Sequence, residues 1–98
     1  MAELHAVYGD MTFNSRKNRD DSVQQMTSLA AAQGFEVPTA AVFPDYPLGM
    51  TNVGTTGAKF CYTHTSEPVV DAALASLNAY FAANGRADGS FGSQRISD

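Results

Sequence analysis

Hydrophobic and polar positions alternate along several short stretches of the chain. Residues 3–13 and 58–65 are rich in β-branched and aromatic side chains and predict strands, the second being the clearer. Residues 36–43 predict another strand, and Pro38 favours an edge position for it. Gly9 interrupts the first strand and is a candidate bulge.

Two other stretches have the hydrophobic spacing of helices. Residues 20–33 form the first, with Asp20 or Asp21 as its cap and Gly34 in a left-handed position just past its end. The second begins after Ser66. Its apolar stripe recurs at i, i+3, i+4, i+7 and i+11 and comprises Val70, Ala73, Leu74, Leu77 and Phe81. We expect Leu74 and Leu77 to be buried.

The remaining stretches are irregular or ambiguous. Residues 44–57 contain prolines and glycines and predict a long connection. Residues 86–98 are polar and glycine-rich, and predict a flexible or weakly ordered tail or a weak last strand. Residues 1–85 then form a single domain.

The order β-α-β-β-α, with a doubtful last strand, predicts an α+β protein of the ferredoxin-like split β-α-β type. Its first and third strands are expected side by side at the centre of an antiparallel sheet. Both helices are expected on one face, so the other face is solvated, paired with a second subunit or used for binding.

The composition of the chain disfavours several classes of protein. The 98 residues suffice for one core, and 44% are hydrophobic. A lone cysteine, Cys61, favours a reducing compartment, and neither a secretory leader nor a membrane-spanning run is visible, so a cytoplasmic location is expected. The net charge of −4 disfavours binding to nucleic acid or to an anionic membrane.

Acid–base chemistry has few candidates. His5 and His64 are the two histidines, and the topology places them at the same sheet margin. Together with Tyr62 and Asp10 they are the candidate catalytic residues; ordinary, partly exposed histidines are the alternative. No HxH, CxxC or HExxH spacing is present, so no metal site is expected. Cys61 is expected to be a packed structural residue.

A basic cluster precedes the first predicted helix. Arg16, Lys17 and Arg19 can form a weak anion site with the helix N-terminus, although Asp20 and Asp21 oppose it and a solvated loop is the alternative. No glycine-rich phosphate loop precedes the helix, so no nucleotide cofactor is expected.

The aromatic residues are the most suggestive set. Tyr8, Phe60 and Tyr62 form a binding platform if they share the open sheet face, and core packing under the helices is the alternative. Segments 7–11 and 57–62 resemble the two signatures of the RNA-recognition motif, which places aromatics on the same two strands. The second segment lacks the usual glycine–aromatic alternation, and the negative charge argues against that function.

The preferred hypothesis is a small-molecule-binding domain acting as a homodimer. Its ligand-binding candidates are Tyr8, Phe60 and Tyr62 on the sheet and Tyr46, Leu48 and Met50 in the 44–57 loop. The layout is similar to that of dimeric α+β barrel proteins, in which two sheets enclose a pocket. A cofactor-free enzyme of acid–base isomerase or oxygenase type on that scaffold is one alternative. An acidic protein-interaction or inhibitor module is the other.

Overall fold

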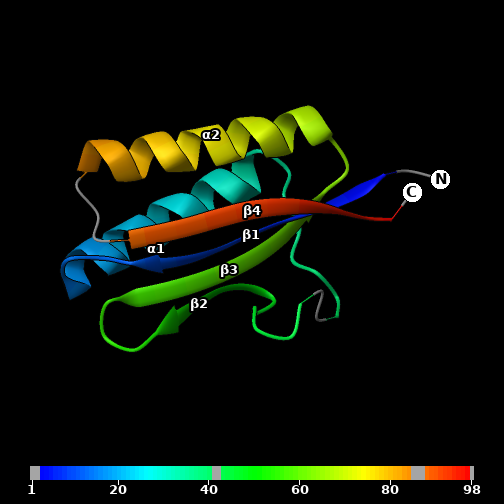
Figure 1. Cartoon of the computed structure of the whole chain (residues 1–98). Coiled ribbons are helices and arrows are strands. Elements are labelled where there is room, and N and C mark those ends of the chain that lie inside the picture. Colours follow the sequence, from blue (N-terminus) through cyan, green and yellow to red (C-terminus); the bar gives the residue numbers. More distant parts are fainter. Residues whose placement is uncertain (1–2, 41–42, 85–87, 98) are drawn as a thin grey trace.

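The computed structural model describes residues 3–40, 43–84 and 88–97 of the chain. Its elements are, in chain order, β1 (Leu4–Thr12), α1 (Arg16–Ala32), β2 (Gly49–Val53), β3 (Gly57–His64), α2 (Glu67–Asn84) and β4 (Asp88–Ser97). They form two layers, a four-stranded sheet and two helices on one of its faces (Figure 1). Neither of the described helices is long and apolar enough to cross a membrane.

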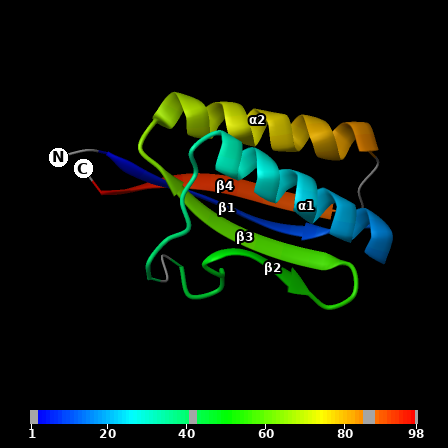
Figure 2. The ribbon, with the colours of Figure 1, turned by 180° about the vertical axis from the view of Figure 1, so that it is seen from behind.

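The strands lie in the order β2-β3-β1-β4, and every neighbouring pair is antiparallel. This is the arrangement of the ferredoxin-like split β-α-β fold, so the predicted fold class is confirmed. β1 and β3 form the centre as expected, paired from His5 opposite His64 to Thr12 opposite Gly57. β4 lies beside β1 in both views, which brings the two ends of the described chain close together (Figure 1, Figure 2).

The second strand lies later in the chain than the hydrophobic pattern predicts. Part of the predicted strand 36–43 lies outside the described residues, and Glu36 makes an isolated bridge to Thr63. The strand β2 instead occupies part of the predicted irregular connection 44–57. Gly54 has a φ of 63° and lies in the hairpin between β2 and β3, where a left-handed residue is favourable. Gly54, one of the glycines that suggested a loop, therefore lies in a turn between paired strands.

The helix α1 begins one turn before the predicted helix 20–33. The Ser15 hydroxyl caps it by accepting a hydrogen bond from the Asn18 backbone N–H at 3.1 Å. The basic residues expected in a preceding loop thus belong to the first turn of the helix. At the other end, Gly34 has the predicted left-handed conformation, with a φ of 84°.

The C-terminal segment contains a regular strand, where the sequence left a weak strand or a flexible tail open. The strand β4 pairs with β1 along its length, with Phe91 opposite Gly9. The Phe91 ring packs against Phe60 and Phe81 at centroid distances of 6.1 and 5.0 Å. Aromatic packing over the sheet therefore anchors this strand. Residues 86–87 and 98 of the segment lie outside the described residues.

The hydrophobic core lies between the sheet and the helices. Its buried members are Val7, Met11, Phe13, Ala58, Phe60, Tyr62 and Val70. Val70 represents α2 in this core, whereas Leu74 and Leu77 are half-buried, so the expectation that both are buried is wrong. Leu77 is only half-buried because its side chain lines an open pocket between the two helices.

Candidate functional site

A pocket of about 270 Å³ lies between α1, α2 and the sheet, and we call it the interhelical pocket. Its floor is the helix-facing side of the central strands. The residues that line it are Val7, Gln25, Met26, Leu29, Ala30, Gln33, Phe35, Met50, Phe60, Tyr62, Ala73, Ser76, Leu77 and Tyr80. None of these described residues carries a charge. The lining is mostly apolar, as is common in sites that bind small organic molecules.

Both helices contribute a wall to the interhelical pocket. Met26, Leu29 and Ala30 recur at helical spacing and form the wall on α1, where Leu29 is 50% exposed. Ala73 and Leu77 form the facing wall on α2. The helical spacing therefore identified these side chains correctly as apolar faces. It did not show that the two faces stand apart.

Polar groups in and beside the interhelical pocket are few. Burial raises the pKa of the Tyr62 hydroxyl, and a hydrogen bond with Thr27 offsets part of that rise. The Tyr80 hydroxyl lies 2.8 Å from the Ser22 hydroxyl, within hydrogen-bond distance. Tyr62 is therefore a neutral, hydrogen-bonding group at neutral pH.

The predicted ligand-binding residues separate into two sets. Phe60, Tyr62 and Met50 line the interhelical pocket. Tyr8 pairs with Cys61 in the sheet register, so its side chain points to the opposite face from the neighbouring Phe60 and Tyr62. The idea that all three aromatics share the open face is wrong, and the core-packing alternative holds for the two on β3. Leu48 is exposed.

Tyr8 belongs to an aromatic cluster on the open face of the sheet. Its ring centroid lies 4.8 Å from that of Phe43 and 5.2 Å from that of Tyr46. The Lys59 ammonium lies 5.8 Å from the Tyr46 ring centroid, at cation–π distance. The chain's own segment between α1 and β2 thus covers part of the face where the sequence suggested a pocket.

The four acid–base candidates do not form one site. His5 and His64 are paired across β1 and β3, as predicted. His64, however, lies 3.0 Å from the Gln33 carbonyl oxygen through Nε2, and its Nδ1 accepts the Ser66 backbone N–H at 2.9 Å. These contacts tie the ends of the two helices to the sheet and give His64 a structural role.

Asp10 is separate from the other acid–base candidates. It is exposed, and it alternates along β1 with Val7, whose side chain lines the interhelical pocket. Its partner in the β1–β3 register is Lys59. The described geometry therefore brings no general acid and base together across the pocket.

The residues of the basic cluster form ion pairs within α1, and Arg19 also donates hydrogen bonds to the hairpin between β2 and β3. Arg16 lies 4.0 Å from Asp20, and Lys17 lies 2.7 Å from Asp21. Arg19 is buried, where its guanidinium contacts Asp20 at 2.6 Å. Each cation has an acidic partner, so the arrangement does not favour an anion site.

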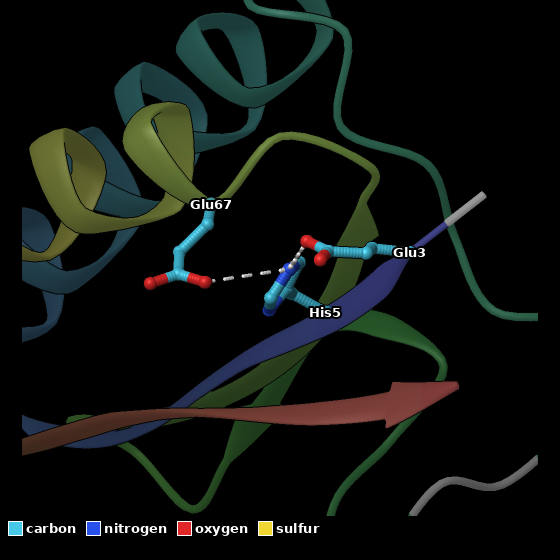
Figure 3. Close-up of side chains that lie close together, drawn as sticks. All are labelled: Glu3, His5 and Glu67. Carbon is cyan, nitrogen blue, oxygen red and sulfur yellow. Dashed lines mark hydrogen bonds and ion pairs between the residues drawn. The ribbon is translucent and has the colours of Figure 1, made fainter. Parts of the chain in front are cut away.

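A second cluster of ionisable side chains, Glu3, His5 and Glu67, lies at one end of the sheet. Glu3 Oε2 is 3.1 Å and Glu67 Oε2 is 4.0 Å from His5 Nε2, and the three atoms all lie within 4.8 Å of one another. Both carboxylates point toward the imidazole in Figure 3. Sequence spacing missed this set because Glu67 comes from the start of α2, far along the chain. Glu3-x-His5 was the local signal, since alternate strand residues share a face.

No protein-family model matches the chain, and no curated protein matches it at a significant level. The fold class alone does not define a function, because the ferredoxin-like scaffold supports many unrelated activities. The interhelical pocket and the chemistry of its lining are therefore the features from which a function can be inferred.

Proposed function

We propose that the protein binds a small, uncharged and largely apolar organic molecule in the interhelical pocket. The observation that carries the proposal is an apolar space of about 270 Å³ that the two helices leave open above the sheet. Protein interiors are normally close-packed, and open apolar surface is costly in water. A ligand that fills this space would complete the core.

The size and the lining of the pocket define the class of ligand. An apolar cavity of roughly 150 Å³ holds benzene, and drug-sized ligands occupy pockets of roughly 300–1,000 Å³. The interhelical pocket therefore fits a molecule somewhat larger than a single aromatic ring. Gln25, Gln33 and Ser76 supply neutral polar groups, so one or two hydrogen-bonding groups on the ligand would be tolerated.

The methionines provide a direct test with indole as the probe. Met26 and Met50 line the interhelical pocket, whereas Met11 is buried outside it. In a sample labelled with ¹³C at the methionine methyl groups, we expect indole to shift the Met26 and Met50 signals in a saturable manner. The Met11 signal should move much less. Equal shifts at all three methionines, or none, would contradict the proposal.

A matched pair of substitutions on α2 controls for changes in folding. Ala73 lines the pocket and Ala72 is exposed on the same helix. Ala73→Leu should fill part of the space and weaken indole binding by about tenfold, the effect of roughly 1.4 kcal/mol. Ala72→Leu should leave binding unchanged. If both variants bind indole as tightly as the parent protein, the probe occupies another place.

Homodimer formation, expected from the sequence, stays a prediction. An aromatic cluster of Tyr8, Phe43 and Tyr46 lies on the open face of the sheet. We infer that a second subunit, where it forms, packs on this cluster, while the interhelical pocket is built from one chain alone. Light scattering across a range of protein concentrations measures the subunit count, and a constant monomer mass would exclude the dimer.

A further inference from the structure

The three side chains Glu3, His5 and Glu67 have the composition of a transition-metal site. One imidazole nitrogen from β1 and two carboxylate oxygens, from the residue before β1 and from the first turn of α2, converge here (Figure 3). Zinc takes nitrogen and carboxylate oxygen ligands of these kinds, with bonds of about 2.0–2.2 Å. Tetrahedral ligands at such bond lengths lie about 3.3–3.6 Å from one another. The distances of 3.1 and 4.0 Å from His5 Nε2 to the two carboxylates bracket that separation.

The imidazole is the fixed member of this cluster. The His5 side chain is 6% exposed, whereas those of Glu3 and Glu67 are 46% and 62% exposed. Its Nε2 is directed at the space between the two carboxylates, and a single N–H there can satisfy one of them. Glu67 lies at 4.0 Å, beyond hydrogen-bond distance. The two glutamates can adjust by rotation, so a cation at the shared point would be contacted by all three side chains.

In the described part of the chain, Glu3, His5 and Glu67 are the best-placed set of metal ligands. The neighbouring side chain of Arg95 and the other candidate ligands, His64 and Cys61, support this choice. Arg95 engages the other oxygen of Glu3, with its Nη2 at 3.6 Å from Oε1, and Oε2 stays directed at His5. Both ring nitrogens of His64 have partners already. Burial raises the pKa of the Cys61 thiol, which disfavours the thiolate that a metal needs.

We propose that Glu3, His5 and Glu67 bind one Zn²⁺ ion with an open coordination position. Three protein ligands leave a fourth position for water, which is the arrangement of accessible rather than purely structural zinc sites. The nitrogen ligand disfavours Mg²⁺ and Ca²⁺, because these cations prefer all-oxygen sites. The proposal does not depend on the ligand of the interhelical pocket.

Calorimetric titration of ZnCl₂ into the chelator-treated full chain tests this site. We expect one zinc ion per chain, and we expect zinc but not magnesium to raise the melting temperature. Glu67→Gln should weaken zinc binding by about tenfold or more, since even outer-shell partners of zinc ligands are worth about 10–100-fold. Glu3→Gln should act in the same direction. Asp71→Asn is the matched control, because it removes one carboxylate from an exposed position one turn further along α2.

A second readout separates coordination from general electrostatic attraction. Cobalt(II) in place of zinc should give the visible absorption of a low-coordinate site in the parent protein and in Asp71→Asn, and should lose it in Glu67→Gln. Zinc binding that is unchanged in both glutamate variants would place the ion elsewhere and overturn the proposal. Absence of zinc binding to the parent protein would also overturn it, leaving the cluster as a hydrogen bond between His5 and Glu3 with Glu67 nearby.

Discussion

Arg19 shows how one buried side chain can join two parts of this fold. Its guanidinium Nη1 donates to the carbonyl oxygens of Gly54 and Gly57 at 3.2 and 3.0 Å, and its Nε contacts Asp20. These contacts tie the first turn of α1 to the hairpin between β2 and β3. We expect Arg19→Met to lower the free energy of unfolding by about 1–3 kcal/mol, because charged hydrogen bonds are lost.

Urea denaturation of Arg19→Met measures this cost, and Arg16→Met is its control. The Arg16 side chain is 75% exposed and its ion pair with Asp20 is long. Removing it should change the stability by less than about 0.5 kcal/mol. If both substitutions have equal effects, the hairpin contacts of Arg19 contribute nothing to stability.

The Cys61 thiol should make stability depend on alkaline pH. Burial raises its pKa, so the folded protein keeps the thiol neutral at a pH where the unfolded chain ionises it. The stabilisation is complete below the unfolded-state value of about 8.5 and is lost as the pH rises toward the folded-state pKa. Between about pH 8.5 and 10, Cys61→Ala should lose stability less steeply with pH than the parent protein. Denaturation curves across that interval test this, and parallel pH dependences would contradict it.

At the residue scale, the sequence predicts which side chains of a strand point to opposite faces of the sheet. It does not predict which of the two faces packs against the helices. The sequence shows that Cys61 points away from Phe60 and Tyr62, and the structure confirms it through the sheet register. Alternation does not say which set faces the helices, and aromatic side chains favour both a core and a binding surface. That choice is made by the packing of helices that lie far away in the sequence.

At the element scale, local sequence patterns did not always predict where helices and strands begin and end in the folded structure. The aspartates at 20 and 21 indicated a helix start by charge, but the Ser15 cap is a hydrogen bond and begins the helix earlier. The stretch 36–43 has strand composition, yet β2 is formed by residues that pair with β3 through a hairpin. Strand pairing decides such cases, because β propensity depends strongly on context.

Gly9 illustrates the constraint that pairing places on a strand. It lies opposite both Phe60 and Phe91 and the register is regular there, since the register shift of β1 against β4 lies between Leu4 and His5, so the predicted bulge at Gly9 is wrong. A side-chain carbon at Gly9 would overlap both rings, which lie across the backbone there. We expect Gly9→Ala to cost about 1–3 kcal/mol by overpacking.

A double substitution tests the cause assigned to Gly9. Phe91→Leu removes one of the two rings, so Gly9→Ala should be less destabilising in that background than in the parent protein. Thermal denaturation of the four proteins of the cycle gives the coupling between the two positions. Strictly additive effects would show that contact with the Phe91 ring contributes nothing to the cost.

At the scale of the whole molecule, the sequence was sufficient for the fold class but not for the site. The number and order of the elements, and right-handed crossover connections, lead to the split β-α-β arrangement. The interhelical pocket depends on how far α1 stands from α2, and nothing local in either apolar stripe specifies that separation. The Glu3, His5 and Glu67 cluster likewise needs the start of α2 to meet the start of β1.

Weak nucleic-acid binding, expected from the sequence, stays a prediction. Phe60 and Tyr62 face the helices, so the open face lacks the aromatics that the RNA-recognition motif presents from its third strand. The net charge is −4, and the basic residues of α1 have acidic partners. Fluorescence anisotropy with single-stranded RNA should show binding no tighter than roughly 10⁻⁴–10⁻⁶ M at physiological salt. Tight, strongly salt-dependent binding would contradict this.

The pairing of β1 with β4 has a consequence for synthesis in the cell. β1 is made before β4, its second partner in the sheet, and most of the described chain lies between them. Translation proceeds at about 5–20 residues per second, so the interval lasts on the order of seconds. During that time the edge of β1 that will receive β4 presents unpaired backbone groups, the feature through which strands associate between molecules. The nascent chain is therefore vulnerable to misassociation until β4 emerges.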